Sequence, residues 1–520
     1  MTGNPGPDFK DIAHCVRRHA ANAPRQPALV LGGHSLDYAG LDAVMDRVAC
    51  ALQRDGLVPG DTIALCASMS IDYVGVFLGA LRAGVAVAPL APGSGTQGLA
   101  RMVSDAQARC VFVDADSAAL FGSESRGAPL LINLHGAGDQ GSLAHWLRDT
   151  GAPPRAVDIQ PQWPFNIIYS SGTTGEPKGI VQSHGMRWTH VRRGAAYGYG
   201  PDTVTLLSTP LYSNTTLVVF CPTIACGGTV VLMPKFDARA YLELAQRHRV
   251  THTMLVPVQY QRLMVLPDFD RFDLSSFHVK FSTSAPFGAP LKADVLKRWP
   301  GGLVEFYGMT EGGGTCILDA HLHPDKLHTV GVPATGHDIR LIDDSGVEVV
   351  PGGAGEVVGH SLGMMTGYHG QPEKTREAEW FDPTGKRFIR TGDIGRFDAD
   401  GFLILFDRKK DMVISGGFNI YPSDLEAVLR QHPAVADVAV VGVPSERWGE
   451  TPVGFVVLRP GQSVPAAELL GWANAQLGKT QRLHDLQLCA DLPRSAIGKV
   501  LKRELRAVYG STSHNETLSP

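Results

Sequence analysis

The chain has 520 residues, which is too long for one compact core, so we expect two or more domains. Its 44% apolar and 19% charged residues are typical of a globular protein and exclude disordered and fibrous classes. A net charge of −4, without a dense Lys/Arg tract, argues against a nucleic-acid partner. The eight cysteines form no CxxC or His–Cys cluster, which predicts reduced, buried thiols.

The N-terminal stretch MTGNPGPDFKDIAH (1–14) has no apolar core and is not a signal peptide. The longest apolar segment, TLVVFCPTIACGGTVVLM (216–233), is interrupted by Pro222, Gly227 and Gly228. It predicts a buried helix, a turn and a strand rather than a membrane span. We therefore expect a cytoplasmic protein without a membrane span.

Helical and strand patterns alternate through the first 400 or so residues. DYVGVFLGALRAG (72–84) predicts a helix, and VAVAPL (85–90) predicts the strand after it. YLELAQRHRV (241–250) followed by THTMLVP (251–257) repeats that order. Such alternation predicts an α/β fold with parallel sheets covered by helices.

The pattern changes near FLILFDRKKDMVISGGFN (402–419). The elements predicted after it are helix 423–433, strand 435–444, strand 451–460 and helix 466–478. They predict a compact α+β module. We therefore place a domain boundary between 1–407 and 408–520, with a charged hinge, and expect the polar tail 511–520 to be disordered.

The stretch YSSGTTGEPKG (169–179) follows FNII (165–168), an apolar run that predicts a buried strand. A strand leading into a loop rich in glycine and hydroxyls, with one lysine, is typical of a phosphate-binding loop. It is not a Walker loop, because Pro177 precedes Lys178 and Gly179 follows it, and it contains no G-x-G-x-x-G. On this loop alone, a surface turn without a ligand stays open as the alternative.

GHSLG (359–363) matches the G-x-S-x-G nucleophile elbow of α/β-hydrolases, with Ser361 as the nucleophile. An elbow opens into a helix, but Gly367, Gly370 and Pro372 follow within a few residues. We therefore expect Ser361 to lie in a loop, and a serine hydrolase is the alternative from another enzyme class.

Three further segments carry candidate residues. VEFYGMTEGGG (304–314) offers an aromatic ring for a base and a carboxylate for Mg²⁺. RTGDIG (390–395) places Asp393 in a turn where its carboxylate can accept ribose hydroxyls, and LPRSAIGKVLKRELR (492–506) places Lys499 after a glycine. Taken singly, each has a simpler structural interpretation: a core tyrosine, a turn aspartate, a solvated basic face.

Together and in this order, these motifs and DRKKDMVISGGFNIYP (407–422) resemble the signature set of the acyl-adenylate-forming superfamily. This superfamily includes acyl-CoA and aryl-CoA synthetases, adenylation domains and firefly luciferase, and the resemblance extends from about residue 10 to 506. It implies a large N-terminal domain of stacked, mostly parallel sheets with a barrel-like part, and a small mobile α+β C-terminal domain. Residues 354–375 resemble a structural segment of the family, which implies a structural role for Ser361.

The resemblance implies that a carboxylic acid attacks ATP to form acyl-AMP and pyrophosphate, and that coenzyme A then takes the acyl group as a thioester. Lys499 is the implied catalytic residue, bridging the substrate carboxylate and the α-phosphate. Glu311 is the implied Mg²⁺ ligand. The implied ATP-binding residues are Ser170, Ser171, Gly172, Thr173, Thr174, Gly175, Lys178, Ser284, Ala285, Pro286, Tyr307, Gly308, Thr310, Glu311, Asp393 and Arg408.

The second step implies a rotation of the C-terminal domain about a hinge at Lys410. Gly416 and Gly417 would then line the coenzyme A tunnel, since side chains there would block a narrow channel. A rival reading keeps the same chemistry but loads a carrier-protein pantetheine, and another is a catalytically silent nucleotide-binding protein. The form of residues 407–422, and no carrier domain after residue 506, favour coenzyme A. The oligomeric state stays open.

The implied acyl pocket contains Tyr212, Ser213, Asn214 and Gly312. Ser213 stands where a histidine is usual in such synthetases, and it cannot pair with an ammonium as the aspartate of amino-acid-activating domains does. An amino acid is therefore disfavoured.

FSTSAP (281–286) adds hydroxyls at Thr283 and Ser284, which favours a polar or aromatic acid over a plain fatty chain. We also expect Gly312 to Gly314 to leave open space for a bulky acyl group. The identity of the acid stays open.

Overall fold

The computed structural model divides into two compact units. One comprises Met1–Ile339 with Gly359–Ile389, and the other comprises Arg340–Val358 with Arg390–Pro520. The described residues are 9–121, 129–135, 141–148, 153–170, 178–408, 411–415, 418–445, 448–478, 482–495 and 498–516. The boundary after residue 407 and the hinge at Lys410, which lies outside the described residues, stay predictions.

A nine-stranded, mainly parallel sheet forms one layer of the first unit in the described residues. In order across the sheet, its strands are β15 (Val332–Pro333), β14 (Cys316–Asp319), β13 (Gly302–Tyr307), β12 (Val279–Ser282), β11 (His252–Leu255), β9 (Val204–Leu207), β10 (Thr229–Leu232), β1 (Pro27–Leu31) and β2 (His34–Asp37). Strands β13 to β1 run parallel, and β14, β15 and β2 are antiparallel edge strands.

A second sheet of the first unit has seven described strands. In order, they are β18 (Gly367–Tyr368), β8 (Lys178–Ser183), β7 (Pro164–Ser170), β4 (Ala86–Pro89), β3 (Thr62–Cys66), β5 (Cys110–Val113) and β6 (Leu130–Asn133). Strands β7 to β6 are parallel, and β8 and β18 are antiparallel additions at one edge. The two sheets confirm the predicted α/β fold class.

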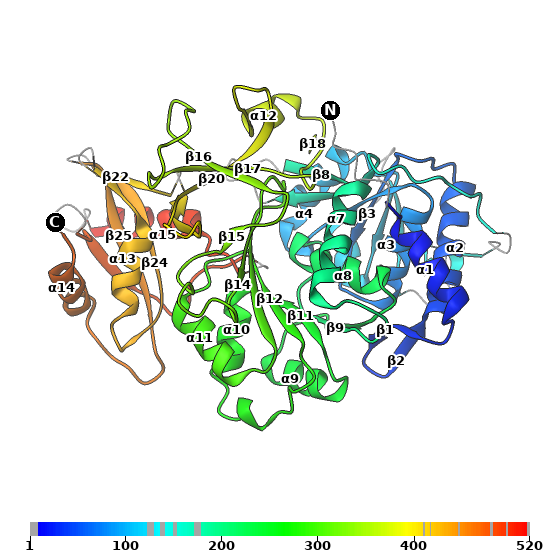
Figure 1. Ribbon diagram of the computed structural model, residues 1–520, viewed down its shortest axis with the longest axis horizontal. Helices are drawn as coiled ribbons and strands as arrows, with labels where there is room; N and C mark the ends of the chain where they lie inside the picture. Colours follow the sequence, from blue (N-terminus) through cyan, green and yellow to red (C-terminus); the bar gives the residue numbers. More distant parts are fainter. Residues whose placement is uncertain are drawn as a thin grey trace. The chain divides into compact units, whose positions relative to one another are not determined.

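Helices α7 and α8 lie between the two sheets (Figure 1). The helices of the first unit are α1 (Ile12–Asn22), α2 (Tyr38–Arg54), α3 (Ile71–Arg82), α4 (Gly95–Asp105), α5 (Ala115–Ala118), α6 (Leu143–Trp146), α7 (His184–Gly194), α8 (Asn214–Ala225), α9 (Ala238–Arg247), α10 (Pro257–Met264), α11 (Ala289–Arg298) and α12 (Pro372–Glu377). Residues 216–233 form most of α8, a turn and β10, as predicted. Within the described ranges, no helix has the length and apolar character that crossing a membrane requires.

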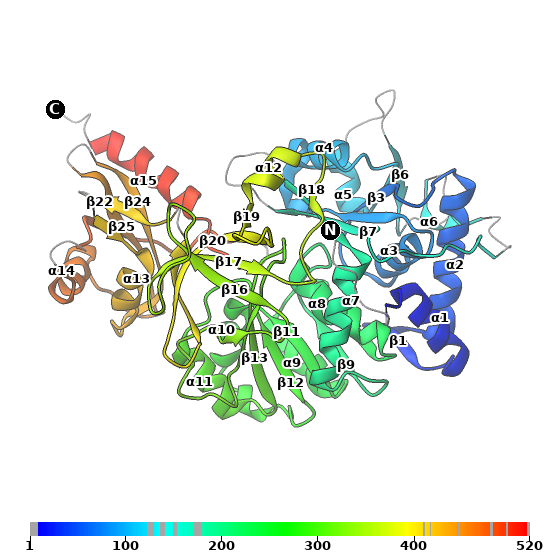
Figure 2. The same ribbon diagram turned by 45° about the horizontal axis from the view of Figure 1, so that its top comes forward.

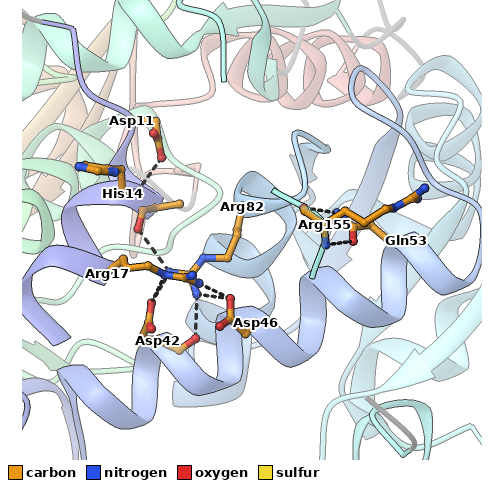
Figure 3. A network of polar contacts seen from close by, with 9 residues as sticks. Asp11, His14, Arg17, Asp42, Asp46, Gln53, Arg82 and Arg155 are labelled. Atoms are coloured by element: carbon orange, nitrogen blue, oxygen red, sulfur yellow. Dashed lines mark hydrogen bonds and ion pairs between the residues drawn. The ribbon is translucent and has the colours of Figure 1, made fainter. Parts of the chain in front are cut away.

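A cluster of polar contacts fastens the first helices together (Figure 3). Arg82, at the end of α3, donates to Asp42 (2.5 Å) and Asp46 (2.8 Å) of α2, and also to the carbonyl of Ala13 in α1 (3.3 Å). Arg17 of α1 pairs with the same two carboxylates. Because the Arg82 side chain is nearly buried, these charges hold the three helices in one arrangement.

Five strands between Asp338 and Arg408 form a further, open sheet in the described residues. They are β16 (Asp338–Ile342), β17 (Gly355–His360), β20 (Arg387–Phe397) and β19 (Glu379–Phe381) in that order, with β21 (Leu403–Arg408) on β20. The expected barrel-like part is thus not closed within the described residues.

The second unit contains the predicted α+β module (Figure 2). Its sheet has the order β23 (Phe418–Ile420), β22 (Val413–Ser415), β25 (Gly449–Leu458) and β24 (Val435–Ser445), with β26 (Asp485–Leu488) on β25. Its helices are α13 (Pro422–Arg430), α14 (Ala466–Gln476) and α15 (Lys502–Glu516).

Both faces of strand β24 are covered. Val438 and Val440 belong to a core that includes Leu425 and Leu429 of α13, whereas Ala439 and its alternate neighbours contact the side of α15. Side chains alternate across a strand, so burial on both faces explains the continuous apolar run that the sequence shows here. Helix α15 extends through residues 511–516, where the sequence predicted a disordered tail.

A buried ion pair supports strand β13. The Lys292 ammonium of α11 lies 2.5 Å from the Glu305 carboxylate and donates to the carbonyl oxygens of Leu327 (2.8 Å) and Thr329 (3.1 Å). Burial raises the pKa of Glu305, and Lys292 counteracts that shift. The pair lies two positions before Tyr307 and fixes α11 on that strand.

We expect Lys292→Met to destabilise the first unit by about 3–5 kcal/mol, because it leaves the Glu305 carboxylate buried without a countercharge. Lys292→Met with Glu305→Leu should recover most of this loss. The measurement is the urea midpoint of unfolding by tryptophan fluorescence. The control is Lys280→Met, since this buried lysine donates only to the carbonyls of residues 299–301 and leaves no orphan charge. Equal losses in the two single variants would contradict the ion-pair argument.

Candidate functional site

The predicted nucleotide residues of the first unit follow two neighbouring parallel strands. Strand β12 ends at Ser282 and pairs there with Glu305 of β13. The segments 283–286 and 307–311 therefore leave the sheet at the same edge. Ligands of open α/β sheets bind at the carboxyl ends of parallel strands. This edge thus brings together Ser284, Ala285, Pro286, Tyr307, Gly308, Thr310 and Glu311.

The predicted acyl residues reach this edge through a hydroxyl contact. The Thr215 and Ser284 hydroxyls lie 2.6 Å apart, which joins the start of α8 to the segment after β12. Ser213 is the N-cap of α8, and its hydroxyl accepts from the Thr215 amide (3.3 Å). A capping role explains a serine at this position without any role as a gate. Ser284 itself has φ +81°, an uncommon conformation for a residue with a side chain.

The glycine-rich loop connects two antiparallel strands, and Ser170 of β7 pairs with Lys178 of β8 across its base. The predicted strand 165–168 is confirmed. Ser171, Gly172, Thr173, Thr174 and Gly175 lie outside the described residues, and their phosphate contacts stay predictions.

Lys178 is linked to Glu311 through a tyrosine that sequence reasoning missed. The Lys178 ammonium lies 5.0 Å from the centre of the Tyr368 ring. The Tyr368 hydroxyl donates to Glu311 Oε1 (3.0 Å). Burial raises the pKa of Tyr368, and the neighbouring Glu311 carboxylate raises it further, so the hydroxyl stays a donor. The sequence did offer one indication of this tyrosine, because Gly367–Tyr368 belongs to the 354–375 segment that resembles the family.

Glu311 fits a magnesium site that is completed by substrate phosphates. Its Oε1 accepts from Tyr368, and the described residues give its Oε2 no hydrogen bond. No cluster of three metal-ligating side chains occurs among the described residues. Mg²⁺ is commonly held by one or two carboxylates together with phosphates and water, so a single carboxylate linked to Lys178 through Tyr368 suits it.

A buried guanidinium lies beneath the predicted acyl residues, and sequence reasoning missed it. Arg187 of α7 is fully buried and donates to Asn166 Oδ1 (2.9 and 3.0 Å), Asn214 Oδ1 (2.7 Å) and Gln182 Oε1. Gln182 in turn donates to the carbonyl of Thr310 (2.6 Å). The network thereby fixes an acyl-pocket residue and the YGMTE segment together.

The expected open space at the glycines is wrong. A Cβ at Gly312 would lie 1.9 Å from the carbonyl oxygen of Gly363, and one at Gly314 would lie 2.3 Å from Ile339. Gly312 also has φ +78°. The glycines are required because the 359–363 backbone approaches closely, so they provide no volume for an acyl group.

Ser361 has a structural role, as the resemblance implies. Its buried hydroxyl donates to the Gly313 carbonyl and accepts from the Gly363 amide (3.0 Å). No helix follows it within the next ten residues. The serine therefore holds the close approach at Gly312, and the hydrolase alternative has no structural support.

Three predicted residues lie in the second unit. Asp393 does not lie in the predicted turn: it lies within strand β20 and pairs with Arg408 of β21 across the strands. Lys499 lies in a tight turn, where its amide donates to Ser495 Oγ (3.1 Å) and its carbonyl accepts from the Ser495 amide (2.8 Å). Gly416 and Gly417 lie outside the described residues, so their tunnel role stays a prediction.

Comparison with known families gives two matches. Residues 16–369 match the AMP-binding enzyme family, and residues 424–499 match the AMP-binding enzyme C-terminal domain. The chain belongs to this family. It is a member of the acyl-adenylate-forming superfamily, in the acyl-CoA synthetase branch, and thus an AMP-forming acid–thiol ligase.

Several relatives match over nearly their whole length. A feruloyl-CoA synthase of an Amycolatopsis species is 33% identical, over 95% of this chain and 98% of the relative. An indoleacetate–CoA ligase of Aromatoleum aromaticum is 31% identical, over 97% and 99%. The crystal structure of ATP-bound MatB from Rhodopseudomonas palustris is 30% identical with a TM-score of 0.83, covering 96% of this chain and 99% of that chain.

We expect Tyr368→Phe to weaken binding of magnesium–ATP roughly tenfold, because the lost hydroxyl no longer orients the Glu311 carboxylate. The ring under Lys178 is kept, so ATP binding without magnesium should change little. Calorimetric titration with ATP, with and without Mg²⁺, measures both. Tyr241→Phe, which removes a buried hydroxyl bonded to Thr253 in the same unit, is the control. A loss that is the same with and without Mg²⁺ would contradict this role.

Proposed function

We propose that this enzyme uses ATP and Mg²⁺ to activate an aromatic or medium-sized organic acid and transfers the acyl group to coenzyme A. One set of contacts carries the proposal: the Lys178 ammonium lies over the Tyr368 ring, and the Tyr368 hydroxyl donates to Glu311, four residues after Tyr307. A cation for the leaving phosphates and a carboxylate for the metal, with the Tyr307 ring available to the base, are what transfer of the adenylyl group of ATP to a carboxylate needs.

In the first step, a substrate carboxylate oxygen forms a bond to the α-phosphorus, and the bond to the β-phosphate oxygen breaks to release pyrophosphate. Magnesium, when bound, neutralises phosphate charge. Glu311 would hold the metal, and Lys178 would neutralise the leaving pyrophosphate. Lys499 would stabilise the charge shared by the carboxylate and the α-phosphate. In the second step, the coenzyme A thiol loses its proton, its sulfur bonds to the acyl carbon, and AMP leaves.

The charge near the predicted acyl residues argues against an amino acid. Asn214 Oδ1 accepts from the buried Arg187 guanidinium, and Ser213 caps α8. Neither residue supplies a negative charge, and the buried cation repels a substrate ammonium. Phe281 and Phe306 stack with ring centres 5.3 Å apart on the neighbouring strands, which suits an aromatic acid. The names of the feruloyl and indoleacetate relatives agree with this.

The test is mass spectrometry of the purified protein with ATP, Mg²⁺ and a panel of aliphatic, aromatic and amino acids, with and without coenzyme A. We expect an acyl-CoA and AMP from an aromatic or medium-sized acid. An acyl-AMP that persists in the presence of coenzyme A, and is consumed only by a holo carrier protein, would replace the coenzyme A assignment with the carrier-loading alternative. Turnover of amino acids alone would refute the proposed acid class.

We expect Lys499→Ala to lower acyl-AMP formation roughly 10²–10³-fold, because it removes the cation between the two reacting anions. Transfer from preformed acyl-AMP to coenzyme A should change little. Pyrophosphate release and single-turnover transfer measure the two steps separately. Lys502→Ala is the control, since Lys502 pairs with Glu426 (3.2 Å) in the same unit. Equal losses in both steps would show that Lys499 has no special role in the first.

A further inference from the structure

Helix α7 carries a row of basic side chains along one side. Arg187, His190 and Arg193 follow one another at intervals of three residues, so they lie close together on the helix. Arg187 Nη1 lies 3.5 Å from His190 Nδ1. Burial, Arg193 and Arg187 hold the pKa of His190 well below its usual range, so the imidazole is neutral and can accept from Arg187. The row therefore has two positive charges.

No carboxylate neutralises this row among the described residues. The Arg187 donors are taken up by amide oxygens of neutral side chains. His337 accepts from the Thr315 amide (2.9 Å), and burial and Arg193 lower its pKa to about 4. The Asp319 carboxylate accepts from the Tyr197 hydroxyl (3.5 Å) and forms no described ion pair with Arg193. Buried cations without a counterion are costly, and proteins usually pair them.

Of the two arginines, Arg193 is the one whose N–H groups have no acceptor among the described residues. Its guanidinium lies 4.7 Å from the centre of the Phe306 ring, and in the described part of the chain it makes no hydrogen bond and no ion pair. A cation–π contact satisfies none of its five N–H donors. The Arg193 side chain keeps an exposed fraction that Arg187 lacks, although burial lowers the pKa of its guanidinium.

The basic residues of α7 contact segments of the predicted acyl and nucleotide site. At its first end, Arg187 contacts Asn214 at the start of α8. Near the C-terminal end of the helix, Arg193 contacts Phe306, which directly precedes Tyr307 on β13. The aromatic rings of Tyr197, Phe281 and Phe306 pack together beside it at centre distances of 5.1 to 6.1 Å. A ligand group beside Arg193 would thus lie next to packed aromatic rings and next to a guanidinium without a hydrogen-bond acceptor among the described residues.

We propose that the acid substrate is a dicarboxylic acid, whose second carboxylate pairs with Arg193 while the first one reacts. This inference rests on the proposed function, since it specifies the group at the unreactive end of the acid that the enzyme activates. An arginine and a carboxylate form charge-assisted, often bidentate hydrogen bonds. The second carboxylate would accept hydrogen bonds from the Arg193 guanidinium and neutralise its charge. This would explain why α7 has buried arginines that no carboxylate of the described residues pairs with.

The test uses 5′-O-(N-acylsulfamoyl)adenosines, stable analogues of an acyl-AMP, and measures binding by calorimetry. Adipoyl and 4-carboxybenzoyl analogues are each compared with the matching terminal carboxamide, which has the same size and no charge. We expect the wild type to bind at least one carboxylate analogue roughly tenfold or more tightly than its carboxamide. Arg193→Gln should abolish that preference while leaving carboxamide binding within about threefold.

Arg192→Gln is the matched control, because Arg192 is the exposed neighbour on the same helix. It should keep the carboxylate preference, and thermal melting checks that Arg193→Gln still folds. Equal wild-type affinities within every pair, or a preference that survives in Arg193→Gln, would overturn the inference while leaving the proposed function intact. Failure of all analogues to bind, including the carboxamides, would refute the proposed function and the inference with it.

Discussion

The buried guanidinium of Arg187 is the interaction on which the arrangement of the first unit depends. Its three amide acceptors, Asn166, Gln182 and Asn214, come from β7, β8 and α8. One side chain therefore joins the seven-stranded sheet to both helices that lie beneath it. Because its acceptors are amide oxygens and the neutral imidazole of His190, the hydrogen bonds are satisfied but the charge is not. The positive potential stays within the unit.

That potential has a chemical consequence. The site has to gather anions: a carboxylate and a nucleotide with three phosphates. A buried positive charge lowers the cost of bringing them together, provided that it does not form a permanent ion pair. Amide acceptors hold Arg187 in place without cancelling its charge, whereas an aspartate in the place of Asn214 would cancel it. Under the proposed function, the same choice would disfavour a substrate ammonium, so one arrangement would suit an acid better than an amino acid.

The sequence predicted those parts of the fold and site that depend on residues close together in the chain. The alternation of helices and strands and the strand before the glycine-rich loop are local, and they form as expected. The contacts between distant segments were not predictable in this way. Nothing near Gly312 indicates that Gly363 lies against it, so the glycine was interpreted as open space.

The basic residues of α7 illustrate the same limit. In HGMRWTHVRRG, the arginines read as an ordinary polar helix face. Only the fold shows that Arg187 is buried and Arg192 exposed, because burial depends on which sheet covers each face. The acceptor amides lie 5 to 27 positions away and have no motif of their own. Tyr368 is similar, since its link to Glu311 joins residues 57 positions apart.

The distribution of the motif residues between the two units bears on the order of the two steps. Lys178, Tyr307 and Glu311 belong to the first unit, whereas Lys499 and the 415–419 loop belong to the second. Acyl-AMP formation requires a cation at the reacting carboxylate, but thiol attack requires room and a channel at the same atom. The resemblance implies that one rotation of the C-terminal domain withdraws Lys499 and brings in the predicted tunnel glycines, and both lie in the second unit. The predicted ribose residues Asp393 and Arg408 share the second unit with Lys499, whereas the predicted phosphate and metal residues belong to the first. A movement of the C-terminal domain would therefore have to occur beyond Arg408, as the predicted hinge at Lys410 implies, if AMP is to keep its ribose contacts.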